Sequence, residues 1–131
     1  MKAPSPRPPA RRADAELLVL QRAEDFAGWL LHHTARWPRS ARHTLTARVE
    51  ARTLEVLDAL VIARYRRTDR LARLDAANLD LERLRYLLRI ARSTQACPAK
   101  THEGACRRID EIGRMLHGWR SGLRANVGAT A

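Results

Sequence analysis

Residues 71–91 read LARLDAANLDLERLRYLLRIA, and their apolar side chains follow the spacing of an amphipathic helix. Side chains three, four and seven residues apart lie on one face of a helix, so such a repeat predicts a buried stripe. The members of this stripe are Leu74, Ala77, Leu81, Leu84, Leu88 and Ala91. Other helices are needed to cover the stripe, and the segment therefore predicts an all-helical fold.

The same helix carries two further surfaces. At about 100° per residue, a second apolar group falls on a separate face. This group consists of Ala72, Leu79, Tyr86 and Ile90. Three arginines, Arg85, Arg89 and Arg92, fall together beside the first stripe. A helix in an isolated small bundle needs only one apolar face, so we predict an oligomer that holds an acidic partner.

The composition agrees with one helical domain that is strongly basic. The chain has 131 residues, a formal net charge of +11 and only 5% aromatic residues. Lys2 and Lys100 are the only lysines. Nearly all of the positive charge is therefore arginine, whose planar guanidinium binds phosphate through two parallel hydrogen bonds. This charge favours nucleic acid or another acidic partner.

The sequence also predicts where the protein is found. No apolar run reaches the roughly 20 residues needed to span a bilayer. The N-terminal residues lack the continuous apolar region of a secretory signal. The chain has two cysteines, and without an export signal a reducing cytoplasm is the expected location. We expect no membrane partner.

Proline, turn residues and capping residues divide the chain into four predicted helices. We expect these helices over residues 14–35, 40–67, 69–94 and 101–118. Their predicted N-caps are Asp14, Ser40, Asp69 and Thr101. Pro38 should end the first helix, because proline disfavours a helical conformation in the residue before it. The short connections predict an antiparallel up-down-up-down four-helix bundle over residues 14–122, between a disordered basic arm (1–13) and a disordered tail (123–131).

The predicted interaction residues form a basic set and an apolar set. The candidate nucleic-acid and partner-binding residues are Arg48, Arg52, Arg66, Arg85, Arg89, Arg92, Arg107 and Arg114. The candidate oligomer-interface residues are Ala51, Ile62, Tyr65, Leu79, Tyr86 and Ile90. Several arginines together can track a phosphate backbone, and with few aromatics beside them we expect contact that does not read the base sequence. Each set also has a plainer interpretation: Glu82 would neutralise Arg85 on a solvated face, and the alanines would be scattered surface residues.

No arrangement of catalytic or metal-binding residues stands out in the chain. Cys97, His102 and Cys106 offer three ligands where a structural zinc site needs four, so we interpret them as two ordinary thiols and a surface histidine. We find no nucleophile and base pair, glycine-rich phosphate loop or carboxylate pair. The sequence therefore predicts a protein without catalytic residues, a resident metal or a cofactor.

Four stretches resemble one family of helical proteins. Residues 111–119, EIGRMLHGW, are similar to the closing signature of the accessory variability determinant of diversity-generating retroelements. The tryptophan-proline pair at 37–38, with the basic turn after it, resembles that family's link between its first two helices. Residues 43–50, HTLTARVE, and 79–91, LDLERLRYLLRIA, resemble its second and third helices. The resemblance spans about residues 16–121.

The resemblance implies a homopentamer of four-helix bundles, a basic barrel that binds a reverse transcriptase and its template-repeat RNA, with DNA or an RNA–DNA hybrid as related ligands. Such proteins support error-prone copying without catalysing it. The spare apolar faces agree with an oligomer but do not by themselves give five subunits. His117 stands where the family more often has glycine, which bears on how the last helix ends. The two tails have no counterpart in the family.

Two other functions stay open at this point. Proteins encoded by intervening sequences of large ribosomal RNA genes share the predicted fold, and their task is unknown. A helical nucleic-acid-binding regulatory module is the second alternative, although the chain has no helix-turn-helix spacing with a short glycine turn. The number of subunits separates these functions, because about five chains favour the retroelement accessory and a single chain favours the regulatory module.

Overall fold

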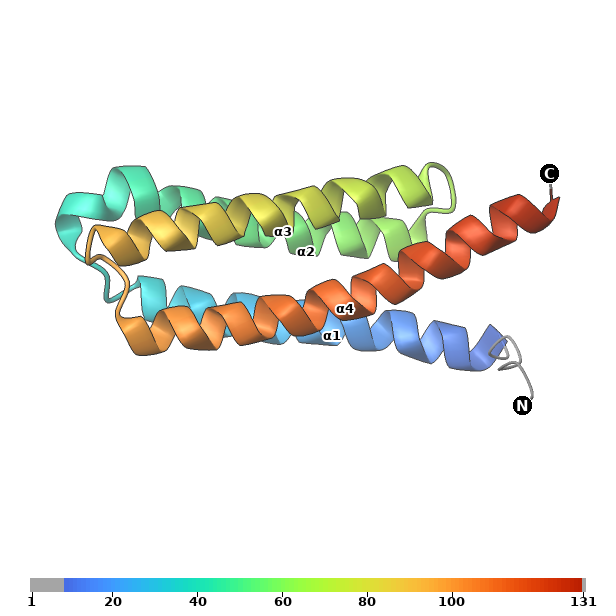
Figure 1. Ribbon diagram of the computed structural model, residues 1–131, viewed down its shortest axis with the longest axis horizontal. Coiled ribbons are helices and arrows are strands. Elements are labelled where there is room, and N and C mark those ends of the chain that lie inside the picture. The colour runs from blue at the N-terminus through green and yellow to red at the C-terminus, as the bar shows by residue number, and fades with distance from the viewer. Residues whose placement is uncertain (1–8, 131) are drawn as a thin grey trace.

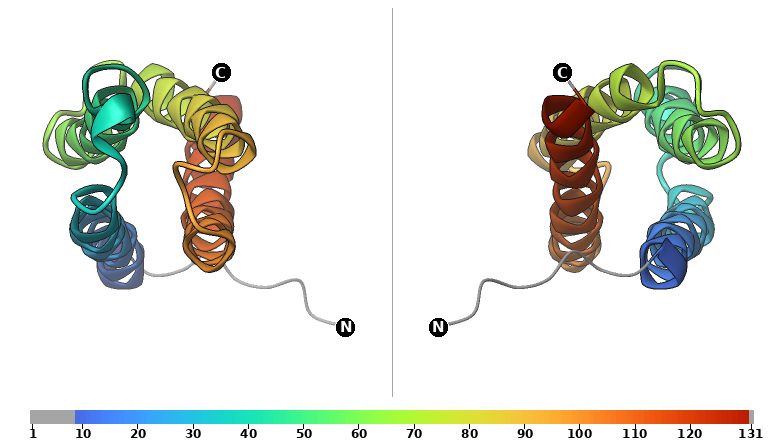
Figure 2. Two further views of the ribbon diagram at one scale, coloured as in Figure 1. Left: turned by 90° about the vertical axis from the view of Figure 1, so that its left-hand side faces the viewer. Right: turned by 90° about the vertical axis from the view of Figure 1, so that its right-hand side faces the viewer.

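The computed structural model describes residues 9–130, and within them the chain forms four α-helices and no strand (Figure 1). The helices are α1 (Pro9–Thr34), α2 (Ala47–Tyr65), α3 (Arg70–Ser93) and α4 (Ala99–Thr130). Two short helical turns, η1 (Arg39–Ala41) and η2 (Arg42–Thr46), join α1 to α2. Consecutive helices run in opposite directions, and the views along the bundle show one helix at each corner (Figure 2). The predicted all-α, up-down-up-down four-helix bundle is therefore confirmed.

The core consists of the predicted stripe of α3 and the apolar stripes of the other helices that face it. All six members of the α3 stripe are at most 2% exposed. The residues that face them include Val19, Phe26 and Leu30 of α1, Val49, Val56 and Leu60 of α2, and Ile109, Ile112 and Leu116 of α4. Burying one such side chain contributes about 1.5–3 kcal/mol. These contacts are therefore the main source of stability.

Helix α1 begins earlier than the sequence predicts. Asp14 is predicted to be the N-cap, but α1 starts at Pro9. The disordered arm is therefore a wrong prediction for residues 9–13. Proline is well placed in the first turn of a helix, where its missing N–H has no partner to lose, and the alanines and arginines that follow have high helix propensity. The remainder of the predicted arm, residues 1–8, lies outside the described residues.

Helix α4 continues beyond its predicted end at Gly118 and reaches Thr130. The disordered tail predicted for residues 123–131 is therefore wrong up to Thr130, and residue 131 lies outside the described residues. A helix commonly ends where a glycine takes a left-handed conformation. None of the glycines in the described part of the chain has a positive φ, so Gly118 does not end the helix.

Contacts with α3 hold the additional turns of α4. Arg120 Nε donates to Asp75 Oδ1 at 2.8 Å, and Arg124 Nη2 donates to the same oxygen at 3.0 Å. Leu123 is partly buried against the core. Asp75 in the first turns of α3 thus pairs with the end of α4, and the core provides apolar surface for Leu123. Sequence periodicity alone does not reveal these contacts.

The connection between α1 and α2 is more ordered than the predicted short turn. Trp37 is 7% exposed and packs into the core, and Pro38 is extended, with φ −57° and ψ 142°. The chain then forms the 3₁₀ turn η1 and the π-helical turn η2 before α2 begins. Ser40, the predicted N-cap, lies inside η1, so that prediction is wrong. The extended proline and the inserted tryptophan delay the start of the regular helix to Ala47.

The turn between α2 and α3 is closed by an arginine. Arg70 Nε donates to the carbonyl oxygen of Ala63 at 2.6 Å, and Arg70 Nη2 donates to that of Arg64 at 3.1 Å, which satisfies carbonyls at the end of α2. Asp69 precedes α3 in a left-handed conformation with φ 57°, and its side chain makes no capping hydrogen bond. Thr101, the other predicted cap, lies inside α4. Both capping predictions are therefore wrong.

A glycine makes a close contact between α1 and α4 possible. A Cβ placed on Gly104 would lie 2.9 Å from a ring carbon of Trp29 and 3.1 Å from Arg108 Nη1. The Arg108 guanidinium covers the Trp29 ring, 3.9 Å from its centroid. The ring is therefore confined between the α4 backbone and a cation, and it has little room to move.

We expect Gly104→Ala to lower the free energy of unfolding by about 1 kcal/mol, because overpacking by one methyl group outweighs the roughly 1 kcal/mol gained in helix propensity. Gly118→Ala is the matched control, since a Cβ placed on Gly118 would have nothing within 4 Å, and it should raise that free energy by about 0.5–1 kcal/mol. Urea unfolding followed by far-UV circular dichroism measures both. Equal stabilisation by the two alanines would contradict the close packing of Gly104 against Trp29.

Candidate functional site

Carboxylates neutralise part of the arginine group predicted on α3, which consists of Arg85, Arg89 and Arg92. Arg85 Nε donates to Glu82 at 3.1 Å, and Arg85 Nη1 donates to Asp110 of α4 at 2.7 Å. The contact with Glu82 that the plainer interpretation expects is therefore present, and Asp110 adds a second acid. Arg89 lies over the ring of Tyr86 instead, 4.8 Å from the centroid. Arg85 thus joins α3 to α4. The exposed positive charge of this group comes from Arg89 and Arg92.

Arg52 is engaged in the same way between α2 and α3. Its Nη1 atom lies 2.9 Å from Glu55 and 3.1 Å from Asp80. Asp80 also lies 3.5 Å from Arg83. Because Arg52 bridges two helices and has two acidic neighbours, its guanidinium is poorly placed to bind a phosphate.

The other six predicted arginines are exposed, and the described part of the chain offers none of them an ion pair. They are Arg48, Arg66, Arg89, Arg92, Arg107 and Arg114. The structure does not bring them into one patch. Arg48 begins α2 and Arg92 ends α3 at the same end of the bundle, whereas Arg66 follows α2 at the opposite end. Their role in binding stays a prediction.

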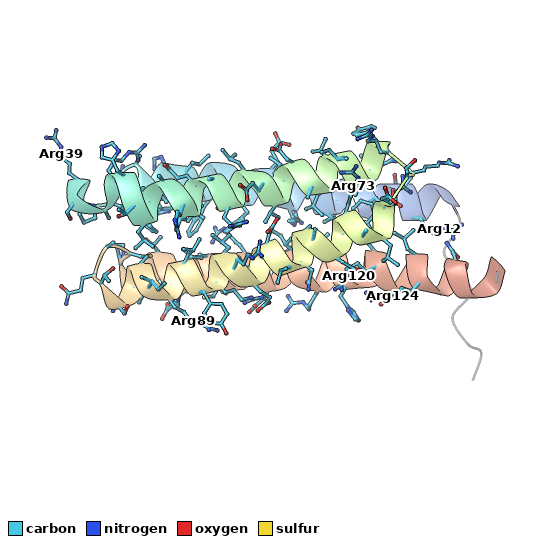
Figure 3. All side chains as sticks on the ribbon, turned by 90° about the horizontal axis from the view of Figure 1, so that it is seen from above. Arg12, Arg39, Arg73, Arg89, Arg120 and Arg124 are labelled. Carbon is cyan, nitrogen blue, oxygen red and sulfur yellow. The ribbon has the colours of Figure 1, made fainter. Side chains whose placement is uncertain are left out.

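A basic group that the predicted set largely missed lies on the connection between α1 and α2 and on the first turn of α2. We call it the basic connection, and it consists of Arg36, Arg39, Arg42, His43 and Arg48, all exposed. Arg39 extends beyond the end of the bundle in the view from above (Figure 3). Residues 26–49 contain no aspartate or glutamate. This long run without acids is the sequence signal that identifies the group.

The apolar face predicted on α3 is exposed in the subunit. Leu79, Tyr86 and Ile90, which we call the outer α3 face, are each at least 50% exposed. They lie on the side of α3 opposite its buried stripe, since the two sets are about half a helical turn apart. Isolated exposed leucines are common, but three large side chains on one helix face form a surface that water solvates poorly.

A second apolar face lies where α1 and α2 run side by side, and it differs from the predicted one. Its members, which we call the α1–α2 face, are Leu17, Leu54, Val61 and Tyr65, all exposed. Glu16 of α1 lies 3.5 Å from Arg64 of α2, which places the turn that holds Leu17 beside the end of α2. Of the residues predicted for α2, Tyr65 belongs to this face and Ile62 is half-buried.

A shallow groove runs between α2 and α3 and contains residues from both predicted sets. Its lining residues are Arg48, Ala51, Arg52, Glu55, Arg83, Tyr86 and Leu87. Ala51 and Tyr86, predicted from separate helices, thus line one depression. A second open depression lies between α3 and α4, where Arg85 and Asp110 form their ion pair. Both depressions are shallow and open to solvent.

The cysteines and histidines do not form a metal site within the described residues. Cys97 is buried between α3 and α4, and burial raises the pKa of its thiol to about 11. Cys106 Sγ lies 3.7 Å from His102 Nε2, which is a weak contact. A thiol with such a raised pKa is a poor nucleophile and a poor ligand at neutral pH, since the thiolate is the reactive form.

Two further findings concern the whole described chain. None of its helices has an apolar stretch long enough to cross a bilayer. A protein-family model described as bAvd-like matches residues 17–123, which include most of all four helices and both apolar faces. A search of curated proteins gives no match.

Proposed function

The chain belongs to the bAvd-like family, and from this we propose that it is a non-catalytic accessory protein of a diversity-generating retroelement. In this role it binds the reverse transcriptase of the element and the template-repeat RNA, and it supports mutagenic copying of that RNA. The family match carries the proposal, because it covers most of the chain and is independent of the charge and surface arguments. The apolar and basic surfaces of the subunit are consistent with the role.

The two apolar faces support assembly into a ring. The outer α3 face and the α1–α2 face belong to different helices, and these helices occupy different corners of the bundle (Figure 2). When one surface of a subunit binds a different surface of the next, the contact is head-to-tail, and its repetition closes a ring if the rotation allows. We propose a homopentamer of this kind. The number five comes from the family resemblance, and the two faces supply the contacts.

The basic surface supports contact with RNA. A formal net charge of +11 attracts polyanions and raises the rate of encounter with them. The arginines that have no carboxylate neighbour are the ones available to phosphates. A guanidinium that an acid already neutralises cannot also neutralise a phosphate, and it therefore releases no counterions. Binding of this kind weakens steeply with salt and is insensitive to the base sequence.

Co-purification tests the proposed function most directly. A tagged copy of the chain is expressed with the reverse transcriptase encoded beside it, and the two are expected to elute together after nuclease treatment, since the proposed complex includes protein contacts. The control is the same tag on an unrelated helical protein of similar positive charge, which should retain no enzyme. If the polymerase passes through with the control and with the bAvd-like chain alike, the proposed role is wrong.

A further inference from the structure

We infer that the basic connection is a docking surface for the phosphodiester backbone of single-stranded RNA. This inference rests on the proposed function, because it locates the RNA contact that the function requires. The sequence-based set places that contact mainly along the helices, whereas the basic connection lies at the end of the bundle where α1 passes into α2. Its charge, its anchoring and its lack of large exposed apolar side chains support this location.

The charge of the basic connection is available to a ligand. Arg36 and Arg39 are exposed and form no ion pair with any described residue. Arg42 lies 3.4 Å from Glu50, whose carboxylate already accepts a hydrogen bond from Thr34 Oγ1 at 2.7 Å. This pair is long and the carboxylate is shared. Fewer carboxylates lie near these guanidiniums than near Arg52 and Arg85. An incoming phosphate therefore meets less competition from acidic side chains here.

The pKa of the neighbouring His33 also reflects nearby positive charge. The pKa of His33 is lowered from its usual value of 6.5, first by burial and then by the charges of His32, Arg36 and Arg108. No acid lies within residues 26–49 to offset these cations. The part of the shift that comes from Arg36 and Arg108 reflects positive charge beside the connection, and such charge favours a nearby anion.

The backbone of the basic connection is anchored at both ends. Trp37 and Thr46 are buried, with 7% and 1% of their surface exposed, and between them the chain winds as a 3₁₀ turn and a π turn. Turns of the π type are rare and often occur at functional sites. An anchored platform loses little conformational entropy when it binds, so its arginines act as a preorganised group.

The chemistry of the surface favours nucleic acid over an acidic protein. Protein interfaces have an apolar centre within a polar rim, whereas interfaces with nucleic acid are more polar and strongly positive. All of the large hydrophobic residues exposed in the described chain lie outside residues 32–48. The exposed apolar faces therefore suit protein partners, and the basic connection suits a phosphate backbone.

Matched charge reversals at the two ends of the bundle test the inference. The site variant is Arg36→Glu with Arg39→Glu. The control is Arg12→Glu with Arg67→Glu, two exposed arginines at the other end of the bundle, one in the first turns of α1 and one just after α2. Both variants change the net charge by the same amount. Fluorescence anisotropy with a labelled single-stranded RNA of about 20 nucleotides, over a range of salt concentrations, gives the affinity and its salt dependence.

We expect the site variant to bind this RNA about tenfold more weakly at physiological salt, and its log–log salt slope to fall by about 1.4, or roughly 0.7 for each phosphate that is no longer neutralised. The control should bind less than threefold more weakly and keep the slope. Replacing Arg36 and Arg39 by lysine should restore most of the affinity, because lysine keeps the charge. Far-UV circular dichroism checks that all variants are equally helical.

Each contrary result has a separate meaning. If the unaltered chain does not bind the RNA, the proposed RNA-binding function fails, and the inference fails with it. If the unaltered chain binds but the site and control variants are weakened equally, only the location is wrong. If the site variant loses affinity for polyglutamate but not for RNA, the surface binds an acidic polypeptide, and the inference is overturned.

Discussion

Chains that carry Leu79→Glu and Tyr86→Glu on the outer α3 face, or Leu54→Glu and Val61→Glu on the α1–α2 face, are expected to sediment as single subunits. The unaltered chain should sediment with the mass of about five subunits. Each pair of substitutions places two charges in the apolar contact that we propose between subunits. Desolvating an unpaired charge costs several kcal/mol, so the contact should not form. Glutamate has high helix propensity, so helicity should not change.

An equal mixture of the two variants distinguishes a head-to-tail ring from a symmetric dimer. Each variant keeps the face that is altered in the other, so a mixture forms one intact contact and should give dimers that contain one chain of each kind. Sedimentation at about 100 μM, with one variant labelled, measures this. Dimers formed by one variant alone would contradict head-to-tail assembly, and an unchanged mass for both would exclude these faces.

The second large effect concerns the core of the subunit. Leu84→Ala is expected to lower the free energy of unfolding by about 3 kcal/mol, because Leu84 is 0% exposed in the α3 stripe and its truncation leaves a cavity that rigid neighbours cannot fill. This is a change of more than a hundredfold in the equilibrium between folded and unfolded chains. Leu18→Ala, the same substitution at a residue that is 40% exposed on α1, is the matched control and should cost less than about 1 kcal/mol.

Urea unfolding at one fixed protein concentration measures both variants. The concentration must be the same because assembly adds to apparent stability by mass action. The midpoint should fall strongly for Leu84→Ala with little change in the slope. A similar midpoint for the two variants would mean that the stripe on α3 is not the centre of the core.

The core and the order of the helices could be predicted from the sequence, because both depend on local periodicity. Each helix shows its buried face through apolar residues three and four apart, and the six α3 residues that gave the prediction are the six that are buried. The exposure of Leu79, Tyr86 and Ile90 follows from the same rule, since these residues fall on the opposite side of the helix. Periodicity thus predicted the fold and one of the two apolar faces, the outer α3 face.

The ends of the helices and the state of the arginines could not be predicted in this way. The extension of α4 depends on Asp75, which is far from Arg120 in sequence and close to it in space. Asp110 neutralises Arg85 across a helix pair for the same reason. A spacing rule within one helix identifies which residues share a face, but it does not include carboxylates supplied by the next helix.

The basic connection has a geometric consequence for the proposed ring. Rotation about a single axis repeats every residue at the same height and the same radius, so the five copies of Arg39 would form one circle. With the ring axis along the bundle, that circle would lie on one rim of the assembly, and a strand of RNA bound there would pass from one subunit to the next.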